Sequence, residues 1–146
     1  MNAVETLILT TIAADATLVT LGLANKPNGD RAVYEGQASQ NTDGTPIVAP
    51  YIVFFKMGAS RDDRTHDRRV SKRPAYTIKV VDQGTSNKRA GQIDERCEDL
   101  FSGETFATIA GRFQCFRTGD MPAMTETVAG KTFKSVGGLY RFSQVK

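Results

Sequence analysis

Near the start of the chain, spacings of three and four residues separate Val4, Leu7, Ile8, Thr11 and Ile12, which predicts that the opening residues form an amphipathic helix. Asn2 precedes this segment and Glu5 lies three residues later, a spacing typical of a capping box. Asp15 is placed to cap a further helical turn, which Gly22 would end. Residues 25–30 are turn-forming residues throughout, so we expect a loop there.

A second stretch with helical spacing covers residues 85–100. Thr85 or Ser86 would cap its start, and Ser102 with Gly103 would end it. Basic residues crowd its first turn and acidic residues its last, which opposes the helix dipole. Packing must therefore hold this helix, through an apolar stripe made of Ala90, Ile93, Cys97 and Leu100.

Several other segments have the alternation, or the β-branched and aromatic content, of strands. Residues 51–55 are almost continuously apolar, which predicts a central strand covered on both faces. In residues 75–82 the side chains of Tyr76, Ile78 and Val80 fall on one face. Further strands are predicted at residues 32–36, 105–109, 113–118, 125–128 and 139–145, with a turn at 119–122.

The order of helix, strands, helix and strands predicts an α+β fold. We expect a mostly antiparallel sheet packed by two helices, with long polar loops or a hairpin. No internal repeat and no shift in composition divides the chain, so residues 1–146 are expected to form a single domain. A chain of 146 residues is long enough to bury a core of its own.

The net charge of +3 is concentrated in residues 60–73. This window holds six basic residues and three acidic ones, whereas the charges of the rest of the chain cancel. We expect a loop or an extended hairpin tip here. Three interpretations stay open, namely a solvated loop, a charged protein–protein contact, and binding of nucleic acid through phosphate neutralisation. The interleaved acids and the absence of aromatic residues in the window weigh against the third.

Two classes of protein are disfavoured by the apolar segments. The longest uncharged apolar stretches, at residues 7–14 and 47–55, are shorter than the roughly 20 residues that span a bilayer. The first residues lack the cationic region of a secretory signal. We therefore expect no membrane association. Cys97 and Cys115 are expected to be buried, reduced thiols, with one disulfide as the alternative.

Residues for catalysis or cofactor binding do not form a recognisable constellation. His66 is the one histidine and stands in a hydrophilic run, so we interpret it as a solvated or interface residue. The neighbouring carboxylates of Asp94 and Glu95 point apart on any regular element. Residues 84–88 lie where a phosphate-binding loop would, but they lack its glycine and lysine spacing and are better read as a helix cap. We expect no enzyme, no cofactor and no metal.

Several short motifs occur in an order that is more specific than any one of them. They are Val-Tyr-Glu-Gly-Gln-Ala at 33–38, Pro-Tyr-Ile-Val-Phe at 50–54, Tyr-Thr-Ile-Lys-Val at 76–80, the helix at 85–100, Arg-Thr-Gly-Asp-Met-Pro at 117–122 and Gly-Gly-Leu-Tyr-Arg-Phe at 137–142. Together they resemble the tail-completion, or tail-terminator, family of long-tailed bacteriophages and prophages. The resemblance covers nearly the whole chain.

This resemblance implies a virion structural protein, as in siphophages, that forms a homo-oligomeric, hexameric ring on the head-proximal end of the tail tube. The ring would stop tube polymerisation, bind the major tail tube protein on one side, and present a head–tail joining surface to a head-completion or connector protein. Genomic DNA would pass through it without sequence-specific binding. Such a ring would assemble in the host cytoplasm and remain at the head–tail junction.

A capping ring needs side contacts between copies and end contacts with different partners. We expect segments 37–46, 58–73 and 119–134 to provide these contacts. The candidate interface residues are Arg61, Arg64, Arg68, Arg69, Lys72 and Arg73. The alternatives are another head–tail connector, such as a stopper or adaptor, a small nucleic-acid-binding module, or a minor hydrolase that uses His66.

Overall fold

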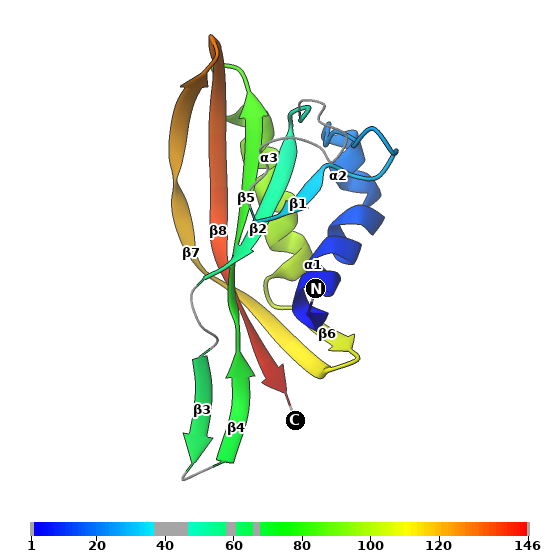
Figure 1. Ribbon diagram of the computed structural model, residues 1–146, viewed down its shortest axis with the longest axis vertical. Helices are drawn as coiled ribbons and strands as arrows, with labels where there is room; N and C mark the ends of the chain where they lie inside the picture. Colours follow the sequence, from blue (N-terminus) through cyan, green and yellow to red (C-terminus); the bar gives the residue numbers. More distant parts are fainter. Residues whose placement is uncertain (1, 37–46, 58–60, 66–67, 146) are drawn as a thin grey trace.

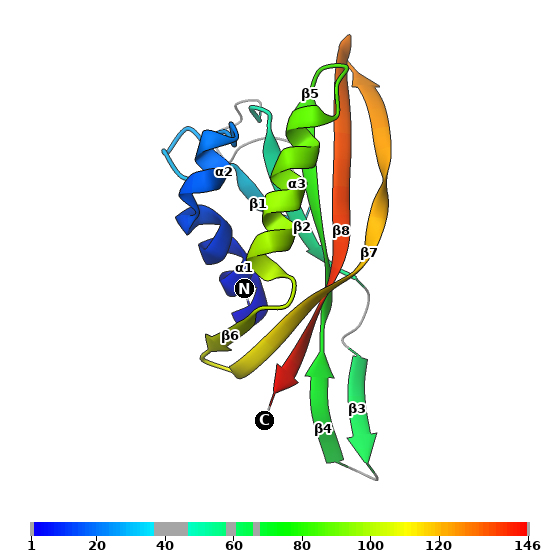
Figure 2. The same cartoon turned by 180° about the vertical axis from the view of Figure 1, so that it is seen from behind.

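Helices cover one face of a six-stranded sheet in this α+β protein (Figures 1 and 2). The computed structural model describes residues 2–36, 47–57, 61–65 and 68–145, and between 61 and 72 it describes the backbone alone. A small two-stranded sheet extends from the lower end of the large one, clear of the helices (Figure 1). The α+β prediction is thus confirmed.

The described residues form three helices, where two were predicted to pack on the sheet. They are α1 (Ala3–Ala14), the single further turn α2 (Ala16–Thr20), and α3 (Lys88–Phe101). The predicted capping box is present at α1, because the Glu5 amide donates to Asn2 Oδ1 and the Asn2 amide donates to Glu5 Oε2, both at 2.9 Å. The start of α3 differs from the prediction. Its N-cap residue is Asn87, whose side chain makes no capping bond, while Ser86 Oγ accepts from the Lys88 amide.

Asp15 joins the three helices at one point. It ends α1 and caps α2, since its carboxylate accepts from the Leu18 amide at 3.0 Å. The same carboxylate accepts two hydrogen bonds from the Arg96 guanidinium of α3, at 2.7 and 3.0 Å. The hydrogen bond from Arg96 lowers the pKa of Asp15, against the opposing effect of burial.

The large sheet has the strand order β1-β2-β5-β8-β7-β6. The parallel pairing of β1 with β2 makes the sheet mixed, which corrects the prediction of a mostly antiparallel one. Its strands are β1 (Val33–Glu35), β2 (Tyr51–Lys56), β5 (Ala75–Gln83), β6 (Thr105–Thr108), β7 (Gly111–Val128) and β8 (Lys131–Val145). The small sheet consists of β3 (Arg61–Thr65) and β4 (Arg68–Arg73). As predicted, β2 is an interior strand, but the described helices cover only one of the two faces that the prediction expected to be covered.

The last two strands are much longer than the sequence pattern indicated. The predicted turn at 119–122 is wrong, because β7 runs through it with register irregularities between Arg117 and Gly119 and between Met121 and Met124. Pro122 is tolerated because β6 pairs with β7 only up to Gln114, so Pro122 lies on an edge where no neighbour needs its amide hydrogen. The last strand likewise begins at Lys131, well before the predicted residue 139.

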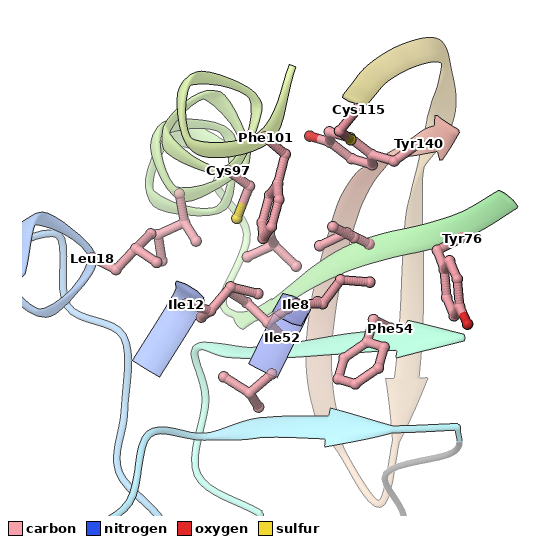
Figure 3. Packing of buried hydrophobic residues seen from close by; sticks show 14 of the residues in the cluster. Ile8, Ile12, Leu18, Ile52, Phe54, Tyr76, Cys97, Phe101, Cys115 and Tyr140 are labelled. Atoms are coloured by element: carbon pink, nitrogen blue, oxygen red, sulfur yellow. The ribbon is translucent and has the colours of Figure 1, made fainter. Parts of the chain in front are cut away.

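The core lies between the helices and the face of the sheet that they cover. Tyr76, Ile78 and Val80 are each at most 1% exposed on this face, as predicted. Figure 3 shows how side chains from α1, α3 and the strands interdigitate, with Phe101 between helix and sheet. Cys97 and Cys115 are buried free thiols in this core, which confirms the prediction made for them. Burial of each large apolar side chain stabilises the folded state by about 1.5–3 kcal/mol, so this layer of core side chains is the main stabilising feature of the fold.

Substitution of Asp15 separates its two roles. Asp15→Ala loses the cap of α2, at about 1 kcal/mol, together with the Arg96 pair. Asp15→Asn keeps a capping side chain and loses only the charge, so we expect it to be the milder change. Because the pKa of Asp15 is lower in the folded state, its contribution is present above the usual aspartate value and is lost as the pH falls below about 4.

Denaturant unfolding from pH 7 to pH 3 measures both effects. The unfolding free energy of Asp15→Asn should fall less steeply in acid than that of the unaltered chain. Parallel curves for the two proteins would contradict a role for this ion pair.

Candidate assembly surfaces

The β3–β4 hairpin carries the predicted interface residues. Figures 1 and 2 show it projecting beyond the sheet, at the end of the molecule opposite the β7–β8 turn. The predicted charged window is thus a hairpin, with Arg61, Arg64, Arg68, Arg69, Lys72 and Arg73 all on its two strands. Their assignment as interface residues stays a prediction.

Two other candidates, His66 and the polar segment 37–46, lie outside the described residues. The third predicted contact segment, 119–134, is the outer half of the β7–β8 hairpin instead of a loop. Its strands join through Ala129 and Gly130, both with positive φ, as in the tight turns that favour the right-handed twist of a hairpin.

Arg117 of β7 connects the sheet to α3, a contact that sequence reasoning missed. Its guanidinium donates to both oxygens of Asp94 on α3, at 2.9 and 3.0 Å. It also donates to Asp120 Oδ1 at 2.8 Å, to the Tyr140 hydroxyl at 3.1 Å and to the Gly137 carbonyl at 3.1 Å. Although the Arg117 side chain is only 8% exposed, its donors are therefore well satisfied.

Burial alone would lower the pKa of Arg117, but the hydrogen bonds and charges of Asp94 and Asp120 raise it on balance. The cluster joins the motif at 117–122 to the motif at 137–142, since Arg117 contacts residues of both. The sequence contained one signal that Arg117 lies on the buried face of its strand. Phe113, Cys115 and Arg117 alternate along one strand, which places Arg117 on the buried face.

The paired glycines of β8 make room for two close approaches. A Cβ at Gly138 would lie 2.5 Å from Arg117 Cζ. A Cβ at Gly137 would lie 2.5 Å from the Ile78 carbonyl oxygen of β5. The lack of a side chain at these two positions therefore lets β8 lie close to β5 and to Arg117. Both glycines lie within β8 and do not mark its start.

The outer surface of α3 carries most of the exposed acidic residues of the helix layer. Its two arginines are engaged elsewhere, because Arg89 pairs with Asp82 at 2.6 Å and Arg96 pairs with Asp15. Exposed carboxylates follow along the second half of α3 and the turn after it, at Glu95, Glu98, Asp99 and Glu104. This surface is consequently negative, whereas the hairpin is positive.

Exposed apolar side chains mark a further surface near the turn that joins β6 to β7. Ile109 is fully exposed there. It borders a groove between α1 and β6 that Leu7 and Ala107 help to line. Two further exposed apolar side chains lie elsewhere, Phe116 within β7 at 48% and Val128 at the β7–β8 turn at 58%. Exposed apolar side chains scattered in this way are common on protein surfaces.

The described residues offer little for chemistry. Among them, no three His, Cys, Asp or Glu side chains lie close enough together to hold a metal ion. Burial raises the pKa of Cys115 to about 12 and also raises that of Cys97, so neither thiol is a ready nucleophile near neutral pH. No helix in the described part of the chain has both the length and the apolar character needed to cross a bilayer.

Comparison with known proteins gives a fold but no family. No protein-family model matches the chain, and no curated protein matches it. A chain from a structure described as the virion of a native gene transfer agent particle matches with a TM-score of 0.66 and 17% identity, over 97% of this chain and 93% of that one. A second solved chain has a TM-score of 0.57 and 15% identity, over 97% and 94%. At these identities the likeness shows that the fold is shared.

Two glycine-to-alanine substitutions test the close packing under Arg117. Gly138→Ala should destabilise the protein by about 1–3 kcal/mol, because the new methyl group displaces the Arg117 guanidinium. Gly91→Ala is the matched control, since its Cβ would meet no atom within 4 Å on α3. It should stabilise the protein by about 0.5–1 kcal/mol through helix propensity.

Thermal or denaturant unfolding gives both values. If Gly138→Ala were as stable as the unaltered chain, the packing described for Arg117 would be incorrect.

Proposed function

We propose that this chain is a structural protein of a phage-like virion that forms a hexameric ring on the head-proximal end of the tail tube. The observation that carries the proposal is the fold, shared over 97% of the chain with a component of a gene transfer agent virion. The order of the sequence motifs, which resembles that of tail terminators, supports the finer assignment. In this role the ring ends tube polymerisation and provides the surface that joins the head.

The shape of the subunit suits this role. A rigid core of helices on a sheet holds two hairpins that extend toward opposite ends of the molecule (Figure 1). A ring subunit must contact copies of itself at its sides and different partners above and below. Hairpins provide such contacts because their backbones are fixed at the base and present an edge to a neighbour.

The proposal specifies partners and location. The ring binds the major tail tube protein on one face and a head-completion or connector protein on the other, while genomic DNA passes through without sequence-specific contacts. It assembles in the host cytoplasm and remains at the head–tail junction of the virion. It works by shape and self-association, with no catalysis and no cofactor.

Another connector component, a stopper or an adaptor, is the second candidate. The fold likeness favours it equally, because a virion contains several ring-forming parts and the match does not specify which one this chain resembles. Electron microscopy distinguishes the two candidates, since only a terminator caps tail tubes that lack a head.

The decisive experiment mixes purified protein with headless tail tubes and images them by electron microscopy. A ring at one end of each tube, and tubes that no longer elongate, is the expected result. A phage or prophage lacking the gene should make tails of abnormal length that do not join heads. Normal-length tails joined to heads in its absence would reject the proposal.

A further inference from the structure

The β3–β4 hairpin spans residues 61–73, which hold six basic and three acidic residues and thus a net charge of +3. Its register places Arg64 opposite Arg69. Residues of like charge directly opposite one another destabilise an antiparallel pair. Asp62 opposite Lys72 is the one pairing of opposite sign in this register. A hairpin with this net positive charge attracts an anionic surface.

The second half of α3 has the opposite imbalance. Glu95, Glu98 and Asp99 share one face of the helix, because they are spaced by three and four residues. The last turn of α3 contains no basic residue to complement the negative end of the helix dipole. Like charges at this spacing near that end destabilise the helix further.

Ion pairs within the described part of the chain leave this surface largely unbalanced. Glu98 lies 3.8 Å from Arg117, whose shorter contacts are with Asp94 and Asp120. Glu95, Asp99 and Glu104 form no ion pair with another described residue. All four carboxylate residues are exposed.

The two surfaces lie apart on the molecule. Figure 2 shows α3 packed on the sheet, with the β3–β4 hairpin extending from the lower end beyond the helices. A contact between them therefore joins two copies of the chain, with different surfaces used on each copy. Such a heterologous contact generates a ring when its rotation closes.

We propose that the basic β3–β4 hairpin of one copy docks on the acidic surface of α3 of the next, formed by Glu95, Glu98, Asp99 and Glu104. This inference rests on the proposed ring and names its subunit contact. Each surface offers the other the opposite charge, whereas a phosphate backbone would complement the hairpin alone. Nucleic acid leaves the acidic surface without a partner, so a second copy is the better occupant.

Charge reversal tests the contact from both sides. One variant carries Arg64→Glu and Arg69→Glu, and the other carries Glu95→Lys and Asp99→Lys. Each should weaken self-association about a hundredfold in analytical ultracentrifugation at low salt, because like charges then face each other. The single reversal Lys88→Glu, at an exposed position outside the predicted contact segments, serves as a control and should have little effect.

Mixing the two variants gives the most specific result. The reversed hairpin of one variant complements the reversed helix of the other, so an equimolar mixture should recover self-association to within about tenfold of the unaltered chain. Such rings alternate the two variants, which an even number of subunits permits. Circular dichroism and thermal unfolding check that both variants remain folded.

Several outcomes would overturn the inference. They are a chain that stays monomeric at high concentration in low salt, α3 reversals that leave association unchanged, or folded variants that fail to recover on mixing. Loss of duplex DNA binding, with self-association intact, in the hairpin variant would assign the hairpin to phosphate. The tube-capping assay keeps the two proposals separate. If both variants still form rings that cap tubes, the terminator role stands and this contact is wrong.

Discussion

The ion pair between Arg117 and Asp94 fixes where α3 lies on the sheet. An arginine on the buried face of a strand is unfavourable unless its donors are satisfied, and here one carboxylate from α3 accepts two of them. The same guanidinium lies over Gly138 and hydrogen-bonds with the Gly137 carbonyl of β8. The Arg117 side chain therefore couples the position of α3 to the contact between β7 and β8. It holds the outer surface of α3 in a fixed position relative to the sheet.

The elements that could be predicted from sequence are those whose cause is local. Asn2 and Glu5 form a capping box because both partners lie within one turn. Ala90, Ile93 and Cys97 are buried because their spacing follows the helix period. Each of these signals depends on neighbours a few residues away, so no tertiary information is needed to read it.

The errors arose where tertiary contacts decide the conformation. Pro122, Gly137 and Gly138 are typical of turns, yet they lie within strands because one is at an unpaired edge and the others admit a neighbour at close range. Alternation placed Arg117 on the buried face, but only the fold identifies Asp94 as its partner. The hairpin at 61–73 lacks an apolar pattern, so its charge could be predicted while its pairing could not.

In the proposed ring, the contacts depend on how far the two hairpins reach from the sheet that holds them. The turn at Ala129 and Gly130 is tight, so a change in length must come from the strands instead. A strand rises by about 3.3 Å per residue, and successive side chains point to opposite faces. One extra residue in each strand would therefore move the side chains beyond it from one face of the hairpin to the other. Variants that keep the same face outward therefore differ in steps of two residues per strand, which sets a unit of about 7 Å for changing the reach of a hairpin in the proposed ring.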